Sequence, residues 1–527
     1  MPTLEWIGKD KVVNHHQEVP FRILDKKYTF NAENSDNMII HGDNLLALKS
    51  LLPQYEGRID CIYIDPPYNT GNEKWVYNDN VNDPRIKKWL GQVVGTEGED
   101  LSRHDKWLCM IYPRLKLLHK LLAKDGIIFI SIDDIEYVNL KCVCDEIFGA
   151  SNRIATLVWK KRYNGAKEKR VIVVQEYILM YVKDLRLIDT LDIPYTEEMI
   201  ARNYVYEDEY VNERGKYRTQ PLEAGNSMGD RENLRFPITA PDGSIIMPRR
   251  QWIWSKEHVE EALKYHELGF SQRNGTWSVF IKQYLKDRQG IQRTTRPFSL
   301  IDNVFTQDGT REMQEIFGNG NEFPFPKPTK LIEQLLTMAC KKENALFLDS
   351  FGGSATTAHS LLKMNKNDNG KRRFILVEMM DYAETLTAER VKRVIKGYGS
   401  GKKKVDGIPG DFTYYELGQP LFKDDKNLNE EVPEEEIRKY VYYMETKKPL
   451  DMATTDNPYL LGKNNDTAYY FFYKKDEITT LNNEFLSMIN TRATEYIIYA
   501  DKCVLSEEIM EKFNIVFKKI PRDITRL

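Results

Sequence analysis

The most informative stretch of the chain reads Ile62-Tyr63-Ile64-Asp65-Pro66-Pro67-Tyr68-Asn69-Thr70-Gly71. Residues 59–64 form an apolar run typical of a buried strand, and the prolines end it because proline cannot donate to a sheet ladder. Asp65 and Tyr68 are therefore expected in a stiff loop at the carboxyl end of a strand, where open α/β sheets bind their ligands. A carboxylate, fixed backbone carbonyls and a flat ring together suit the exocyclic amine of a nucleobase.

A second motif follows another apolar run and opens a helical pattern; it reads Phe347-Leu348-Asp349-Ser350-Phe351-Gly352-Gly353-Ser354-Ala355-Thr356-Thr357. Its glycines allow a tight turn and close approach of a ligand, and a helix N-terminus suits the carboxylate of an amino-acid-like cofactor. The next apolar run ends in Glu378, and an acid in this place is the usual acceptor for ribose hydroxyls. The glycine patterns of dinucleotide sites and P-loops are absent, so S-adenosylmethionine fits best.

Strand-like and helix-like runs alternate around both motifs. Strands are predicted at residues 38–40, 59–64, 127–132, 345–348 and 374–377, and helices at residues 106–124, 331–339 and 356–363. This alternation predicts an α/β fold with a doubly wound, Rossmann-like sheet. Residues 69–103 are polar and Gly-rich, and they predict a long loop.

The alternation stops near residue 155 and returns at Pro328, so a second domain is expected to interrupt the first. The predicted domains are residues 1–154 and 322–413 for the two parts of the α/β domain, residues 155–321 for the insertion, and residues 414–527 for a C-terminal α+β region. The insertion is rich in Tyr, Trp and Arg. Residues 159–170 alone hold six basic side chains and one acidic side chain, which is compatible with contact to a phosphate backbone.

Composition excludes several classes of protein. The length of 527 residues predicts two to four domains, and the hydrophobic share of 41% is enough for each to have a core. No apolar run is long enough for a membrane span, and residues 1–10 lack a signal-peptide pattern, so a cytoplasmic protein without a membrane partner is expected. The six cysteines are scattered without zinc-ligand spacing, and no metal site is expected.

The two motifs, in this order, resemble those of the β-class DNA amino-methyltransferases. Asp65-Pro66-Pro67-Tyr68 is similar to their D-P-P-Y motif, and residues 349–357 are similar to their D-P-F-x-G-S-G-T-T motif. Ser350 replaces the proline of the second motif, and Ala355 replaces its second glycine. Within the class, residues 65–71, 130–134 and 520–523 resemble the modification (Mod) subunit of Type III restriction-modification systems.

The resemblance implies transfer of a methyl group from S-adenosylmethionine to adenine N6 of a base flipped out of double-stranded DNA. It implies that residues 155–321 are the target-recognition domain, and that a homodimer and a helicase-nuclease restriction (Res) subunit are partners. The catalytic residues would be Asp65, Pro66, Pro67 and Tyr68. The cofactor-binding residues would be Asp43, Lys327, Asp349, Phe351, Gly353, Ser354, Thr356, Thr357 and Glu378.

Several alternatives stay open at this point. Asp rather than Ser at the first motif position favours adenine N6 in this class, but cytosine N4 is the alternative target. The same chemistry would serve a solitary methyltransferase without a restriction partner. A non-catalytic DNA-specificity subunit is a different class, and the intact Asp65 and Tyr68 argue against it. For Asp43, a helix N-cap before Leu45 is nearly as well supported as a contact with the cofactor.

Overall fold

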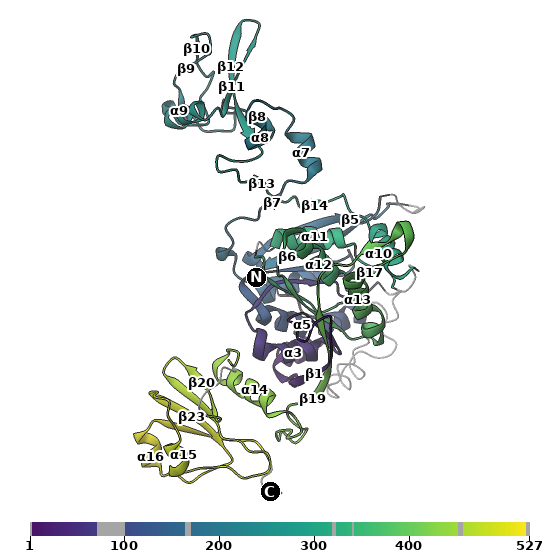
Figure 1. Ribbon diagram of the computed structural model, residues 1–527, viewed down its shortest axis with the longest axis vertical. Coiled ribbons are helices and arrows are strands. Elements are labelled where there is room, and N and C mark those ends of the chain that lie inside the picture. The colour runs from purple at the N-terminus through teal and green to yellow at the C-terminus, as the bar shows by residue number, and fades with distance from the viewer. Residues whose placement is uncertain are drawn as a thin grey trace. The chain divides into compact units, whose positions relative to one another are not determined.

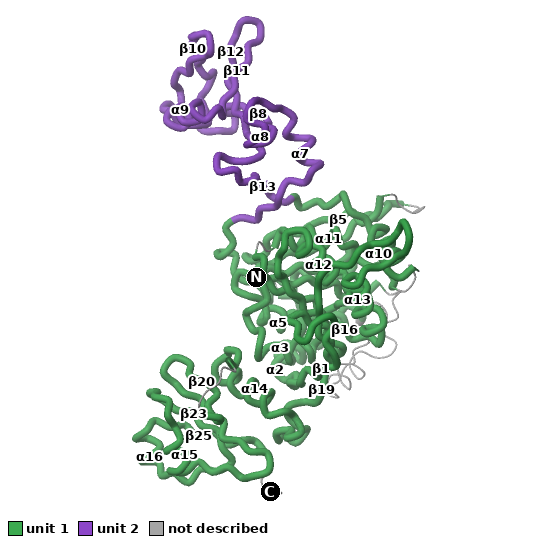
Figure 2. Tube along the Cα trace, viewed as in Figure 1, with its two compact units in different colours: residues 1–189, 298–527 green, residues 190–297 purple. Residues whose placement is uncertain are grey.

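The computed structural model describes residues 3–70, 101–163, 170–318, 323–339, 342–451 and 457–522. The chain divides into two compact units (Figure 2). The larger unit comprises residues 1–189 and 298–527, and the smaller unit comprises residues 190–297. The larger unit therefore contains both sequence motifs.

A large mixed sheet forms the centre of the larger unit (Figure 1). Its middle strands, from β19 to β4 in spatial order, run parallel. This arrangement, with helices between the strands, confirms the predicted doubly wound α/β class. Across the sheet, the strands in the described residues are β1 (Arg22–Phe30), β19 (Phe412–Pro420), β2 (Met38–His41), β16 (Arg373–Glu378), β15 (Leu346–Asp349), β3 (Ile59–Ile64), β4 (Leu122–Ile132), β6 (Gln175–Val182), β5 (Arg153–Lys160) and β14 (Leu300–Ile301).

The middle strands are buried on both faces, which is why they appear in the sequence as unbroken apolar runs. β3 begins and ends at the predicted residues, 59 and 64. It pairs in parallel with β15, so that Cys61 lies opposite Phe347 and Ile62 lies opposite Leu348. The two motif strands are therefore direct neighbours.

Helices cover both faces of the sheet (Figure 1). On one face, α3 (Asn44–Tyr55) packs against α5 (Leu101–Leu121), and both contribute to the core that includes Ile62 and Leu348. Side chains alternate along a strand, so Phe347 points to the opposite face. There α11 (Thr329–Ala339) packs against α12 (Thr356–Asp368), and α13 (Glu389–Lys396) packs against α12.

Further α-helices belong to the larger unit outside its C-terminal region. They are α1 (Lys9–Val12), α2 (His15–Glu18), α6 (Tyr137–Cys144) and α10 (Thr306–Phe317). Among the described residues, no helix combines the length and the apolar character needed to cross a membrane.

The boundaries of the insertion differ from those expected from the sequence. β6 and residues 155–160 of β5 fall within the expected insertion of residues 155–321, yet both strands extend the main sheet, because the apolar β6 is buried against β4. β14 returns to pair with β5. The separate compact unit is therefore shorter, residues 190–297, while residue 321 itself lies outside the described residues. Likewise β19 crosses the expected boundary at residues 413 and 414 because Phe412 and Tyr414 are buried in the main unit.

The smaller unit has its own hydrophobic core. Trp252 lies in this core, and its Nε1 donates a hydrogen bond to the carbonyl of Phe236 at 2.8 Å. Antiparallel β8 (Tyr217–Pro221), β12 (Thr276–Tyr284) and β11 (Leu268–Arg273) form its main sheet. Its other elements are β7 (Ile193–Pro194), α7 (Glu197–Asn203), α8 (Val211–Arg214), β9 (Ile238–Thr239), β10 (Ile245–Ile246), α9 (Lys256–Lys264) and β13 (Thr294–Thr295).

The C-terminal region is α+β, and a buried ion pair holds it together. Arg522 donates to Asp501 at 2.5 and 2.7 Å, and neither side chain is exposed (0%). Thr479 adds a backbone N–H to the same carboxylate at 2.8 Å. The helices and strands of the described residues are α14 (Glu434–Thr446), β20 (Leu460–Asn464), β21 (Thr467–Phe471), β22 (Thr480–Leu481), α15 (Asn483–Ser487), β23 (Glu495–Ala500), β24 (Lys502–Cys503), α16 (Glu507–Lys512) and β25 (Ile515–Lys519).

We predict that Arg522→Met destabilises this region by about 3–5 kcal/mol, because it leaves the buried Asp501 carboxylate without its cation. The measurement is the urea dependence of hydrogen exchange in peptides from residues 457–522. Arg186→Met is the control, since Arg186 forms an exposed pair with Asp184, and it should leave the exchange unchanged. Equal protection in Arg522→Met and the wild type would contradict the prediction.

Candidate active site

Neighbouring parallel strands end at one edge of the main sheet, and predicted site residues follow each of them. Asp43 comes after β2, Glu378 ends β16, Asp349 ends β15 and Asp65 follows β3. Because the carboxyl ends of parallel strands meet at the same edge, the two motifs lie side by side although most of the chain separates them. The two predicted half-sites therefore form one site.

The loop after β3 holds its side chains rigidly. The Tyr68 hydroxyl donates to Asp65 Oδ1 at 2.8 Å. From α5, Trp107 Nε1 donates to the carbonyl of Pro67 at 2.7 Å. Because the Pro67 carbonyl already accepts this bond, the Pro66 carbonyl is the better candidate to accept a hydrogen bond from a ligand.

The turn after Tyr68 is anchored from below. Asn69 adopts a left-handed conformation with φ 61° and is buried. Its amide donates to Glu136, whose fully buried carboxylate also contacts His104 Nδ1 at 2.6 Å. The motif is thus fixed on both sides of Tyr68. Gly71 and most of the predicted loop 69–103 lie outside the described residues.

Lys327 occupies the centre of the site. Its Nζ donates to both oxygens of Asp65, at 2.6 and 2.8 Å, and to the hydroxyl of Tyr68 at 2.9 Å. Burial lowers the pKa of Lys327, but Asp65 and Glu176 outweigh burial, and the net pKa lies above its ordinary value. The sequence assigned Lys327 to the cofactor, whereas the structure places its ammonium group on Asp65.

Glu176, on β6, is a second carboxylate in this cluster. Its Oε2 lies 3.1 Å from the Tyr68 hydroxyl, as a second and longer acceptor for the one proton that Tyr68 shares with Asp65, and 3.7 Å from Lys327 Nζ. Its Oε1 accepts from Lys161 at 2.8 Å. Burial raises the pKa of Glu176, but the two lysines outweigh burial, and the net pKa lies below its ordinary value. The side chain is therefore held as an anion beside Asp65.

The loop after β15 is organised by a buried acid. Asp349 accepts from the backbone N–H of Phe351 at 3.0 Å and from the Thr357 hydroxyl at 2.6 Å. Burial raises the pKa of Asp349 to about 7. Asn44, at the start of α3, donates to the carbonyl of Ser350 at 2.9 Å. Asp349 thus shapes the loop from within and does not face outward as a ligand group.

Two residues of the loop have positive φ angles. Gly353 has φ 47°, and a Cβ there would lie 3.1 Å from the ring of Phe323. Ala355 also has a left-handed conformation, with φ 58°. An L-residue with a Cβ pays about 1–2 kcal/mol for this conformation, so the departure from glycine at position 355 stores strain in the loop.

Glu378 closes the other side of the loop. Its Oε2 accepts from the backbone N–H of Gly353 at 2.7 Å, and its Oε1 accepts from the N–H of Met380 at 3.0 Å. Burial raises the pKa of Glu378. Each carboxylate oxygen keeps a second lone pair for a ribose hydroxyl. A glycine turn, a helix N-terminus and an acid at the next strand end together fit S-adenosylmethionine.

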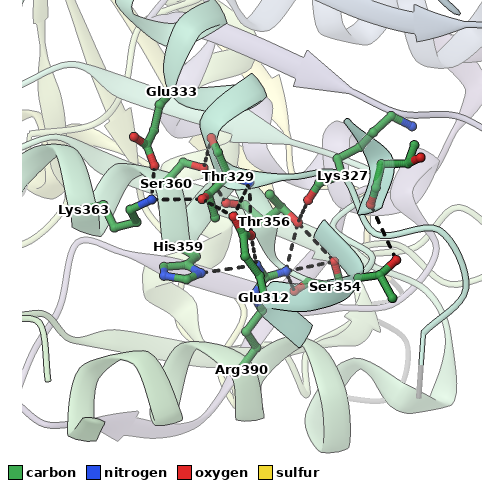
Figure 3. Close-up of polar contacts among 12 residues, drawn as sticks. Glu312, Lys327, Thr329, Glu333, Ser354, Thr356, His359, Ser360, Lys363 and Arg390 are labelled. Carbon is green, nitrogen blue, oxygen red and sulfur yellow. Dashed lines mark hydrogen bonds and ion pairs between the residues drawn. The ribbon is translucent and has the colours of Figure 1, made fainter. Parts of the chain in front are cut away.

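Thr356 links the two half-sites (Figure 3). Its hydroxyl donates to the backbone carbonyl of Lys327 at 3.0 Å and accepts from Arg390 at 2.9 Å. The Ser354 hydroxyl lies 3.1 Å from that of Thr356. Lys327 therefore touches Asp65 through its side chain and the cofactor loop through its backbone.

Asp43 acts as a helix cap in the structure. Its Oδ1 accepts from the backbone N–H groups of Leu45 and Leu46 at 2.8 and 3.3 Å. Its Oδ2 lies 3.7 Å from Arg114, a buried residue of α5. The N-cap alternative is therefore observed, and contact of Asp43 with a cofactor stays a prediction.

Sequence reasoning missed four residues that support the site, Trp107, Glu136, Glu176 and Arg390. Glu176 carried a visible signal, because it is a carboxylate at the start of an apolar strand. The other three lie on or beside helices whose patterns resemble ordinary amphipathic faces. Their roles depend on contacts between distant segments, which a single sequence does not reveal.

Comparison with known proteins gives consistent matches. Residues 59–389 match a family model described as DNA methylase. The chain is 34% identical over 388 residues to the Mod subunit of the Type III restriction-modification enzyme StyLTI of Salmonella typhimurium, covering 71% of this chain and 57% of that protein. It is 32% identical over 413 residues to the Type II methyltransferase M.KpnI of Klebsiella pneumoniae, covering 72% of this chain and 90% of that enzyme.

Among solved structures, the cytosine-N4-specific PvuII DNA methyltransferase is 12% identical and covers 68% of this chain and 87% of that chain, with a TM-score of 0.34. The chain spans little more than half the length of the StyLTI subunit. The family model covers more than half of the 527 residues, and M.KpnI is matched over nearly its whole length. The chain therefore belongs to the DNA methylase family.

Proposed function

We propose that the chain transfers a methyl group from S-adenosylmethionine to N6 of adenine in double-stranded DNA. The observation that carries this proposal is the parallel pairing of β3 with β15, which brings Asp65 beside the glycine loop. Membership of the DNA methylase family supports the reaction class.

The cofactor would lie along the loop after β15. Glu378 would accept from the ribose hydroxyls, and Phe351 would line the pocket. Bound S-adenosylmethionine supplies a methyl group on a positively charged sulfonium. Its methionine carboxylate would meet the N-terminus of α12, where free N–H groups and the helix dipole favour an anion. Gly353, Ser354, Thr356, Thr357 and Asp43 are the remaining residues proposed to contact the cofactor. Asp349 and Lys327 would act indirectly, Asp349 by holding Phe351 and Thr357 and Lys327 through its backbone bond to Thr356.

The target base would enter beside Asp65. Tyr68 would stack on the flipped base, and Asp65 with the Pro66 carbonyl would accept hydrogen bonds from the amine. These contacts orient the nitrogen lone pair toward the methyl group. Asp65 can then accept the proton that the amine loses on methylation. Lys327 now occupies both Asp65 oxygens, and Glu176, 3.7 Å away, offers it an alternative partner when the amine arrives.

Adenine is the favoured base, because Asp65 stands where the resemblance associates Asp with adenine N6. Cytosine N4 is the alternative. Both amines are flat, exocyclic and attached to an aromatic ring, so the same acceptors would serve either. Adenine and cytosine can be distinguished by identifying the methylated base in the DNA product.

The smaller unit would recognise the target sequence. Its surface carries a cavity of about 360 Å³ whose wall combines amide, cationic, aromatic and acidic side chains, which can donate to or accept from base edges. Its lining includes Gln220, Trp254, His258, Lys282, Gln283 and Arg293. These contacts would give the chain a preference for one DNA sequence.

The chain would act as the modification subunit of a Type III system, as a homodimer with a Res helicase-nuclease, in the cytoplasm of a prokaryote. The StyLTI Mod relative supports this assignment. A solitary methyltransferase is the second candidate, and the similarity to M.KpnI, a Type II methyltransferase, favours it. The intact Asp65 and Tyr68 argue against a non-catalytic specificity subunit.

Methyl transfer should depend directly on the Asp65 carboxylate. Asp65→Asn should lower methyl transfer roughly 10²–10³-fold, because one amine acceptor becomes a donor. Transfer of labelled methyl to genomic DNA of varied sequence is the measurement, and binding of S-adenosylhomocysteine should stay near wild type. Asp125→Asn is the control, since Asp125 forms a partly exposed pair with Lys342. A wild-type chain that labels no DNA would overturn the proposed function.

The contributions of the Tyr68 ring and of its hydroxyl can be measured separately with two variants. Tyr68→Phe keeps the ring and loses the hydroxyl contacts to Asp65 and Glu176. Tyr68→Ala also loses stacking, worth roughly 1–3 kcal/mol, so it should bind target DNA about 5–150-fold more weakly than Tyr68→Phe. Fluorescence of 2-aminopurine at the target position reports the flipped base. Equal binding by both variants would exclude stacking by this ring.

The methylated base in the DNA product identifies the substrate. Modification-sensitive sequencing of DNA from cells that express the chain should show N6-methyladenine in one sequence context. Methylation of one strand of an asymmetric site would favour the Type III assignment, and methylation of both strands would favour the solitary enzyme. Detection of N4-methylcytosine instead would show that the substrate base is cytosine and not adenine, and the reaction class would stay the same.

A further inference from the structure

A fully buried guanidinium lies against the cofactor loop (Figure 3). It belongs to Arg390 on α13, whose side chain is 0% exposed. Its NH1 donates to the Ser354 carbonyl at 3.0 Å, to the Ser354 hydroxyl at 3.1 Å and to the Thr356 hydroxyl at 2.9 Å. One nitrogen thus fixes both hydroxyl side chains of the loop.

The charge of Arg390 is only partly balanced. Glu312 Oε2 lies 3.3 Å from its NH2, and the same carboxylate also accepts from the Thr329 hydroxyl at 2.7 Å. On the other side, His359 Nδ1 lies 3.2 Å from NH2. Burial and Arg390 hold the pKa of His359 well below its ordinary value, so the imidazole is neutral and accepts this bond.

A buried cation is costly, and an apolar side chain would usually pack here at lower cost. Arg390 Nε is also buried without a hydrogen-bond partner among the described residues. The residue therefore serves something other than the packing of α13. Its donors converge on Ser354 and Thr356, which stand immediately before and within the first turn of α12.

We propose that Arg390 is a positioning residue for the methionine end of S-adenosylmethionine, an inference that rests on the function proposed above. By fixing Ser354 and Thr356, it sets the direction in which the loop and the first turn of α12 present their N–H groups. The adenosine end would be held elsewhere, by Glu378, which has no direct contact with Arg390 among the described residues.

The same contacts reach the catalytic half of the site. Thr356 donates to the Lys327 carbonyl at 3.0 Å, and Lys327 Nζ lies 2.6 Å from Asp65. Arg390 therefore supports the backbone from which the Lys327 side chain extends. Its effect should appear in cofactor affinity first and in the chemical step only through Lys327.

The test compares two ligands in the full chain by calorimetry. S-adenosylhomocysteine carries the amino-acid end, and 5′-methylthioadenosine lacks it. Arg390→Met should weaken S-adenosylhomocysteine binding roughly 10–100-fold and leave 5′-methylthioadenosine binding nearly unchanged. Arg390→Lys keeps the charge without the planar fork and should give an intermediate loss. Arg393→Met is the control on the same helix, because Arg393 is partly exposed and paired with Glu389.

Selective loss of the ligand with the amino-acid end supports the proposal. If Arg390→Met loses affinity for both ligands equally, or keeps its affinity for both, the proposal is wrong. If Arg390→Met does not fold by circular dichroism, Arg390→Lys decides, by the ratio of its losses of affinity for S-adenosylhomocysteine and 5′-methylthioadenosine. A wild-type chain that binds neither ligand overturns the proposed function and this inference together, whereas unselective loss in the variants overturns only the role of Arg390.

Discussion

The parallel pairing of β3 with β15 is the constraint on which the rest of the site depends. Neighbouring strands lie about 4.8 Å apart, so Asp65 and the glycine loop must emerge side by side once Ile62 lies opposite Leu348. A parallel pair also requires a crossover connection. The smaller unit lies within that connection, and the two motifs can therefore be distant in the chain without being distant in the fold.

This pairing brings several acidic side chains to one edge of the sheet, where their different environments shift their pKa values in opposite directions. Asp349 and Glu378 are buried among backbone donors, and burial raises the pKa of each. The pKa of Glu176 instead lies below its ordinary value, because Lys327 and Lys161 outweigh its burial. Glu176 thus keeps its negative charge beside Asp65, where a base amine would need acceptors. The acids of the cofactor half shape backbone turns, which hydrogen bonds can do without a counter-ion.

The parts of this site that the sequence predicted are local in origin. The apolar run of β3, the proline stop after it and the glycine turn at Gly353 each depend on a few adjacent residues, and all were found. The destination of the Lys327 side chain was not, because a motif shows that a lysine is present but not which half-site it reaches. The role of Arg390 could not be predicted for a related reason. Within Ala388-Glu389-Arg390-Val391 it resembles a solvated helix position, and it is buried only because α12 packs against α13.

The segment that returns from the smaller unit contributes to both halves of the site. α10 carries Glu312, which pairs with Arg390, and the chain then continues to Lys327, which contacts Asp65. Gly309 of α10 packs directly on this continuation, since a Cβ there would lie 2.2 Å from the Pro326 carbonyl. Helix and loop are therefore held as one piece by backbone contact. A displacement of α10 would change the support of the cofactor loop and the position of the ammonium on Asp65 together, because the same stretch of chain holds both.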